Sequence, residues 1–76
     1  MKNYGFNPEI YQTVARNVKK YRELKKLSIQ DLARYAKVSD SFLERFEHST
    51  ENISISIYDL YKISVILDVN INLFFE

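Results

Sequence analysis

The sequence contains no cysteine, one proline, one glycine and one histidine. Without cysteine, the chain cannot form disulfides, thiolate metal sites or a thiol nucleophile, and this composition is typical of a reducing compartment. No window holds the roughly 18 consecutive apolar residues of a membrane span. The N-terminal residues also lack the apolar stretch of a secretory signal, so we expect a soluble cytoplasmic protein.

Turn-forming residues are scarce, because Gly5 and Pro8 are the only glycine and proline in the chain. Tight hairpins depend on such residues, whereas helices can be joined by short polar turns. The 76 residues suffice for one domain, and 46% of them are apolar, which is too many for a disordered chain. These features predict a single all-α domain.

The charges are unevenly distributed, although the net charge is only +1. Residues 1–37 contain nine Lys and Arg against three acidic residues, whereas residues 38–76 contain two basic residues against seven acidic ones. The basic half could attract the phosphates of a nucleic acid. It could equally pair with the acidic half, in the same chain or in a partner chain, and the sequence leaves both alternatives open.

Capping residues mark the starts of the helices that follow the first one. Ser28 and Ser56 are each followed three residues later by aspartate, which is the spacing of a capping box. Ser39 and Asn70 are N-cap candidates for two further helices. The alternating isoleucines at residues 53–57 are interpreted as a loop, because Ser56 caps the helix that follows.

Apolar residues recur at helical spacing between these caps. Residues 57–67 are apolar nearly all round, which predicts a helix packed in the middle of the domain. With the caps, the pattern predicts five helices. The other four carry, in order, Tyr11, Val14, Val18 and Tyr21; Ile29, Leu32, Ala33 and Ala36; Leu43 and Phe46; and Ile71, Phe74 and Phe75.

The helices predicted at about 29–36 and 40–47 are separated by three residues, which is the geometry of a helix-turn-helix. Residues 27–33, 36–47, 60–63 and 67–71 match the pattern of one family in register. Over residues 14–75 the chain resembles the Cro/C1-repressor-type (XRE-like) helix-turn-helix DNA-binding family, with the motif at about residues 28–48. The resemblance implies a five-helix lambda-repressor-like domain, in which residues 1–13 form an N-terminal arm and the start of the first helix.

The resemblance further implies that the helix at 40–47 lies in the major groove of DNA, while the preceding helix crosses the backbone. Phe42 could contact a thymine methyl group there or pack on Tyr35. The implied base-reading residues are Asp40, Ser41, Phe42, Glu44 and Arg45. The implied phosphate contacts are Lys26, Ser28, Gln30, Lys37, His48 and Ser49.

A structural ion pair between Arg22 and Glu47 is also implied, which would lock the first helix to the third.

Three positions depart from the family pattern. Ile29 stands where glutamine is usual, Lys37 where the turn usually has glycine, and Asp40 where a basic or amide residue is common. A left-handed conformation at Lys37 would cost about 1 kcal/mol.

The sequence thus favours a small DNA-binding transcriptional regulator that forms a homodimer through its C-terminal helix. Residues 40–47 hold only Arg45 against three acidic residues, which favours an alternative. In that alternative the domain is an antitoxin-like or regulatory protein-interaction module that binds a basic partner. We expect no enzymatic activity, cofactor or metal site, because the chain has one histidine, no cysteine and no glycine-rich phosphate loop.

Overall fold

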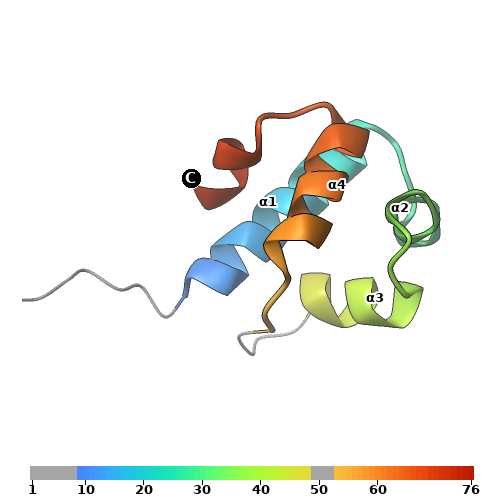
Figure 1. The fold of residues 1–76 in the computed structure, drawn as a ribbon, viewed down its shortest axis with the longest axis horizontal. Coiled ribbons are helices and arrows are strands. Elements are labelled where there is room, and N and C mark those ends of the chain that lie inside the picture. The colour runs from blue at the N-terminus through green and yellow to red at the C-terminus, as the bar shows by residue number, and fades with distance from the viewer. Residues whose placement is uncertain (1–8, 49–52) are drawn as a thin grey trace, which may run out of the picture.

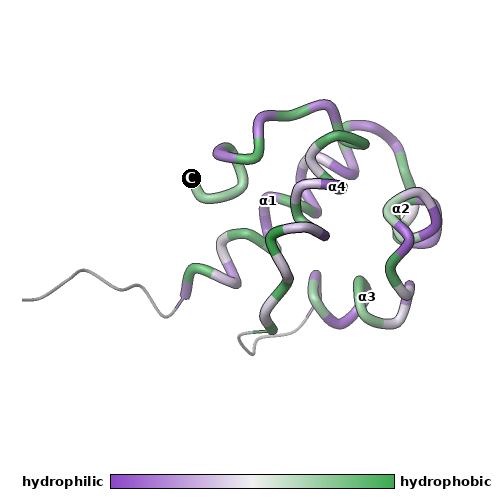
Figure 2. Tube along the Cα trace, in the orientation of Figure 1, coloured by the Kyte–Doolittle hydropathy of each residue, from purple (hydrophilic) through white to green (hydrophobic). Residues whose placement is uncertain are grey.

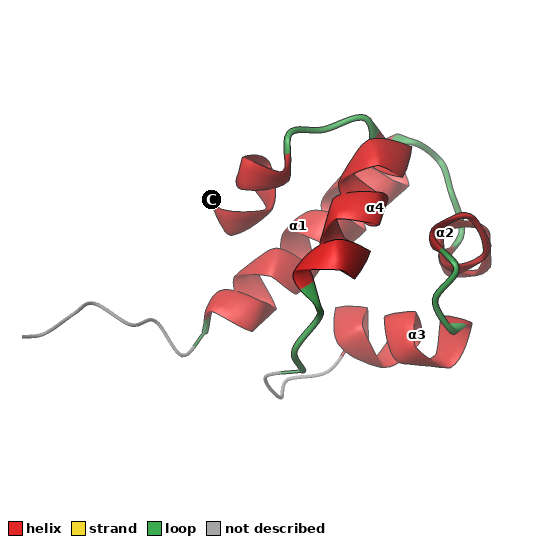
Figure 3. Ribbon diagram, in the orientation of Figure 1, coloured by secondary structure: helices red, strands yellow, loops and turns green. Residues whose placement is uncertain are grey.

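The computed structural model describes residues 9–48 and 53–76. Helix α1 (Ile10–Leu24) and helix α4 (Ile57–Leu67) run side by side through the middle of the molecule (Figure 1). Helices α2 (Ile29–Ala36) and α3 (Asp40–His48) lie at one end, and a short 3-10 helix, η1 (Ile71–Phe75), lies at the other. Within the described residues every regular element is helical, as Figure 3 shows, so the expected all-α class is confirmed.

The prediction of five α-helices is wrong for the last element, which is a 3-10 helix. The Leu73 amide donates to the Asn70 carbonyl three residues back at 2.9 Å, and the Asn70 side chain caps the turn by accepting from Asn72. A 3-10 helix turns about 120° per residue. This rotation allows Phe74 to be completely buried while its neighbour Phe75 remains 44% exposed.

The predicted caps of α2, α3 and α4 are confirmed. Ser28 and Asp31 form a complete capping box, with Asp31 N–H donating to the serine hydroxyl at 2.9 Å and Ser28 N–H donating to the carboxylate at 3.3 Å. The Ser39 and Ser56 hydroxyls accept from the backbone N–H three residues later, at 3.0 and 3.1 Å. Residues 53–56 are a loop, as expected.

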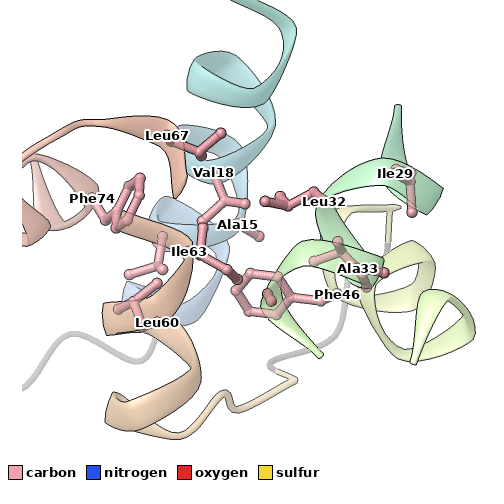
Figure 4. Close-up of a cluster of buried hydrophobic side chains, with 13 residues drawn as sticks. Ala15, Val18, Ile29, Leu32, Ala33, Phe46, Leu60, Ile63, Leu67 and Phe74 are labelled. Carbon is pink, nitrogen blue, oxygen red and sulfur yellow. The ribbon is translucent and has the colours of Figure 1, made fainter. Parts of the chain in front are cut away.

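Apolar side chains from all five elements meet in one core (Figure 4). Phe46 enters it from α3 and Phe74 from η1, with Val18 and Ile63 between them. Apolar and polar residues are interspersed along the helices, as the coloured trace in Figure 2 shows. The buried apolar residues of α1, α2 and α3 belong to this core. The remaining buried apolar residues are Val14, Ala15, Ile29, Leu32, Ala33, Ala36, Leu43, Leu60 and Leu67.

Helix α4 lies in the middle of the molecule, as its apolar pattern predicted, but one side of it is exposed. It packs on α1, α2 and η1 through one side only, because a domain of this size has no further element to cover the other side. Its apolar pattern therefore reflects two different surfaces, a buried one and an exposed one. The exposed side chains are Ile57, Tyr58, Tyr61 and Val65, with exposed fractions of 69, 66, 56 and 59%.

The turn between α2 and α3 places Lys37 in the left-handed conformation, with φ 58° and ψ 42°. The Val38 amide donates to the Ala33 carbonyl at 3.1 Å, and the Lys37 amide donates to the Arg34 carbonyl at 3.3 Å. This pattern ends α2 and redirects the chain into α3. The strain expected at this position is therefore present, since a lysine occupies a conformation that glycine adopts without cost.

Replacing Lys37 by glycine should stabilise the protein by about 0.5–1 kcal/mol, because removal of the side chain relieves this strain. The matched control is Lys25→Gly, because Lys25 ends α1 in the right-handed conformation and gains nothing from glycine. Urea denaturation of the two variants checks the prediction. A Lys37→Gly protein that is less stable than the wild type would contradict it.

Candidate nucleic-acid interface

Helices α2 and α3 form a rigid pair, because each is anchored in the core along one side. Leu43 and Phe46 anchor α3, and Leu32 and Ala36 anchor α2. The three residues between the helices are too few to allow independent movement. The side of α3 opposite the core is consequently held out toward solvent in a fixed orientation.

The exposed side of α3 carries a row of polar side chains. Ser41, Arg45 and His48 follow one another at spacings of four and three residues, so they lie along one face of the helix. Glu44 lies beside this row, and its carboxylate is 3.6 Å from the His48 ring nitrogen Nε2. Asp40, also exposed, lies in the first turn, where its negative charge favours the helix N-terminus. We call Ser41, Arg45 and His48, together with the adjacent Glu44, the α3 row.

Phe42 lies at the flank of the α3 row and is half-buried. Its ring stacks on that of Phe46, with centroids 6.0 Å apart and an angle of 15° between the planes. Tyr35 is 55% exposed and has the Arg34 guanidinium 5.1 Å above its ring. The Phe42 ring thus packs on Phe46 within α3, a contact that the sequence analysis did not consider beside Tyr35 and a thymine methyl group.

Arg22 and Glu47 form the ion pair that joins α1 to α3. The Arg22 Nε atom donates to Glu47 Oε2 at 2.9 Å, and Nη2 donates to Oε1 at 2.8 Å. The third nitrogen, Nη1, donates to the Leu27 carbonyl at 2.7 Å. The Glu47 side chain is fully buried and Arg22 is 8% exposed. The pair thus fixes α3 to both α1 and the turn that begins α2.

This pair also changes the charge that α3 presents to a partner. Its hydrogen bond with Glu47 raises the pKa of Arg22 above its ordinary value, against the opposing effect of burial. The guanidinium therefore stays charged and neutralises Glu47 inside the domain. Only Asp40 and Glu44 remain as exposed acids on α3, against Arg45. The exposed surface of α3 is therefore less acidic than the sequence alone suggests.

The predicted phosphate contacts before α3 lie in the turns that flank α2 and in its first turn. Lys26 is exposed after α1, in a left-handed conformation with φ 60°, and Lys37 is exposed in the α2–α3 turn. Ser28 and Gln30 are exposed at the start of α2, whereas Ile29 between them is buried, with 9% exposure. Ile29 therefore contributes to the core, and Gln30 is the exposed amide at this end of α2.

His48 and Ser49 are the two remaining predicted phosphate contacts. His48 ends α3 and is exposed, at one end of the α3 row. Ser49 lies outside the described residues.

No group of three or more metal-ligating side chains occurs in residues 9–48 and 53–76. Over the same residues, no helix has the length and apolar character needed to cross a membrane.

Two features of the structure were not anticipated from the sequence. The Asn17 side-chain amide donates to the Phe74 carbonyl at 2.8 Å, which ties η1 to α1. The signal for it was weak, because one asparagine on an amphipathic helix resembles a solvent-facing residue. The exposed side of α4 is the second feature, and six tyrosines in 76 residues were its only signal.

Known helix-turn-helix proteins share this geometry. The model of the helix-turn-helix family HTH_3 matches residues 18–74. A crystal structure of SinR, the master regulator for biofilm formation, in complex with DNA is 32% identical, with a TM-score of 0.75 over 83% of this chain and 98% of that one. The N-terminal DNA-binding domain of SinR from Bacillus subtilis is 31% identical, with a TM-score of 0.77 over 86% and 93% of the two chains.

A third structure shares the fold at lower identity. The restriction-modification controller protein C.AhdI from Aeromonas hydrophila is 20% identical, with a TM-score of 0.76 over 86% of this chain and 96% of that one. A search of curated proteins found no match. The family match and the SinR structures cover the α2–α3 pair, the core and α4 together.

Proposed function

The chain belongs to the HTH_3 helix-turn-helix family, and we propose that it is a small sequence-specific DNA-binding transcriptional regulator. The observation that carries the proposal is the exposed α3 row, which the Arg22–Glu47 pair holds rigidly on the surface. The similarity to SinR, whose structure was determined in complex with DNA, supports the same function. The family relationship gives no support to an enzymatic activity.

In this proposal α3 lies in the major groove and α2 crosses the sugar–phosphate backbone. Arg45 donates to the O6 and N7 atoms of a guanine, and Glu44 accepts from the N4 amino group of a cytosine. The two side chains leave the helix about 100° apart, so they reach toward opposite sides of the groove. Asp40 and Ser41 contact bases at the first turn, and Phe42 approaches a thymine methyl group from the flank.

The phosphate contacts we propose lie on both sides of α3. Lys26 and Lys37 would neutralise phosphates directly, and these contacts give affinity without sequence preference. The other proposed contacts are Ser28, Gln30, His48 and Ser49. The pairing of Arg22 with Glu47 assists them, because it removes one negative charge from the surface that faces the phosphates.

We propose that the regulator acts as a cytoplasmic homodimer. Two copies would place their α3 helices in half-sites about 34 Å apart, one turn of DNA. The sequence placed the dimer contact on the last helix, where Phe75 is 44% exposed and Phe74 is buried in the monomer core. Helix η1 therefore offers Phe75 as a large apolar contact residue.

The alternative function is a module that binds a basic protein partner through the acidic residues of α3. Asp40 and Glu44 favour it, since both are exposed beside only one arginine. The pairing of Glu47 with Arg22 weakens this alternative, because it leaves fewer acidic side chains exposed on α3. The two functions differ in one measurable property, because only a DNA reader enriches particular sequences from a pool of random duplexes.

Selection from such a pool should enrich a short sequence that contains a G·C pair at the Arg45 contact. The Arg45→Ala variant should bind the enriched site about 10–100-fold more weakly and accept any base at that one position. Arg16→Ala is the control, because Arg16 is exposed on α1 and contacts Thr13 there. Failure to enrich any sequence, or equal effects of the two variants, would contradict sequence-specific recognition by α3.

A further inference from the structure

His48 is the only histidine in the chain, and it lies in the α3 row that we propose to face DNA. Its ring nitrogen Nε2 is 3.6 Å from the Oε1 atom of Glu44, which lies one helical turn earlier. This distance is too long for a hydrogen bond but fits an ion pair once the ring is charged. The side chains of His48 and Glu44 are 47% and 56% exposed, so protons from solvent reach the ring freely.

Protonation of His48 changes the charge that α3 presents to DNA. Histidine is the side-chain type that ordinarily gains or loses its charge between about pH 5 and 8. With a neutral ring, the exposed charged residues of α3 are two acids, Asp40 and Glu44, against Arg45, which gives −1. A charged ring brings this sum to zero. Since phosphates repel negative charge, the protonated protein should bind DNA more tightly.

The other charged groups that α1 and α2 bring to α3 are already paired. Both helices pack against α3. Glu47, next to His48 in the sequence, pairs with Arg22 of α1 at 2.8 Å. On α2, Asp31 and Arg34 pair with each other at 3.3 Å. The carboxylate one turn before His48 is therefore the acid that the ring meets in the described part of the chain.

The charged ring has a donor that the neutral ring lacks. In neutral imidazole one nitrogen carries a proton and the other is only an acceptor. A carboxylate beside Nε2 favours the proton on that nitrogen, which leaves Nδ1 as an acceptor with nothing to offer a phosphate oxygen. In the charged ring both nitrogens donate. Nε2 can then pair with Glu44 while Nδ1 donates to a phosphate.

We propose that His48 is a pH-dependent positioning residue for Glu44, so that the protein binds DNA more tightly, and selects cytosine less strictly, at about pH 6 than at about pH 8. The inference rests on the proposed function, in which Glu44 accepts from cytosine N4. With a neutral ring, the Glu44 carboxylate is free to turn toward the base. The charged ring holds the carboxylate and offsets its charge, so the repulsion of phosphates and the contact with cytosine weaken together.

Fluorescence anisotropy with the full chain, at about pH 6 and about pH 8 and constant salt, tests the effect on affinity. Because the complex holds the His48 proton more tightly than the free protein does, affinity rises as the pH falls. The wild type should bind the DNA site enriched from random duplexes about 5–10-fold more tightly at the lower pH. In His48→Asn, which stays uncharged, the difference should be less than about twofold. Equal affinities of the wild type at the two pH values, or an undiminished response in His48→Asn, would overturn the proposal.

Glu44→Gln separates the coupling of the two side chains from a direct effect of the ring on phosphate. The glutamine amide has no charge to offset, so the response to pH should fall below about threefold. Selection from random duplexes at both pH values gives a second measurement. The preference of the wild type for cytosine at the Glu44 contact should be stronger at the higher pH, which a merely structural role of His48 would not cause. A full response in Glu44→Gln, or one unchanged base preference, would contradict the coupling.

NMR without DNA separates this inference from the proposed function. The single histidine gives isolated ring resonances, and Glu44→Gln should shift them because the carboxylate lies 3.6 Å from Nε2. Asp40→Asn is the matched control, since Asp40 lies in the first turn of α3 and should leave these resonances unchanged. Such a shift in a protein that binds no DNA would end the proposed function while the pairing stands. Unchanged resonances in Glu44→Gln would overturn the pairing whether or not DNA is bound.

Discussion

Replacing Glu47 by glutamine should lower the free energy of unfolding by about 3–5 kcal/mol. Glutamine has nearly the same shape, so the change removes the charge and leaves the packing in place. The Arg22 guanidinium, only 8% exposed, would then lie in the domain without a counter-charge. A 76-residue protein has a total stability of about 4–11 kcal/mol, so this change would remove a large part of it.

Thermal and urea denaturation of Glu47→Gln measure the effect, with Glu44→Gln as the control. Glu44 lies on the same helix and is exposed, so its replacement should change the stability by no more than about 0.5 kcal/mol. The double variant Arg22→Met with Glu47→Leu should recover most of the loss, since apolar residues fill the site without a desolvation cost. An unchanged melting temperature in Glu47→Gln would show that the pair does not hold α3 in place.

Truncation of Phe74 to alanine should cost about 3–5 kcal/mol, the other large effect that the structure implies. Phe74 is completely buried, and its ring meets Tyr21 edge to face, with centroids 6.1 Å apart. Its carbonyl accepts from Asn17, so η1 is attached to α1 by both the ring and the backbone. Loss of the ring would leave a cavity at the end of the core where η1 docks.

Phe75→Ala is the matched control for this truncation, because the adjacent ring is exposed in the monomer. Its effect on unfolding should stay within about 0.5 kcal/mol. Urea denaturation with both variants checks the difference. Equal losses in the two proteins would mean that η1 does not dock through Phe74.

The sequence predicted the helices well where a cap and an apolar stripe coincide. At Ser28 and Asp31 the capping box fixes the start of α2, and the stripe behind it points to the core. Both signals are local, so the surrounding fold does not alter them. The left-handed turn at Lys37 followed from the family resemblance, and the structure contains it even though lysine pays for it in strain.

The sequence was least informative where a decision depends on what the rest of the fold covers. An apolar residue such as Tyr61 fits a buried helix and an exposed interface equally well. Whether such a residue is buried depends on how many other elements pack around α4. The sequence of α4 alone does not contain that information. The 3-10 geometry of η1 was likewise not contained in the apolar pattern, because that pattern fits an α-helical turn equally well.

For the candidate site, the sequence proposed residues but did not contain their electrostatic surroundings. Counting charges along residues 40–47 treats Glu47 like Glu44. In the structure one is buried against Arg22 and the other is exposed in the α3 row. The distinction depends on a contact between residues 25 positions apart. It is therefore the fold that makes this surface compatible with DNA.

The most direct test of DNA binding by this protein is a fluorescence-anisotropy titration on random-sequence duplex DNA over salt concentrations of about 50 to 200 mM. We predict binding at the low-salt end and a linear fall of the logarithm of the binding constant with the logarithm of salt concentration. Lys26→Ala should reduce that slope by about one unit, since one phosphate contact is lost. A folded protein that shows no binding at about 50 mM salt would contradict the account.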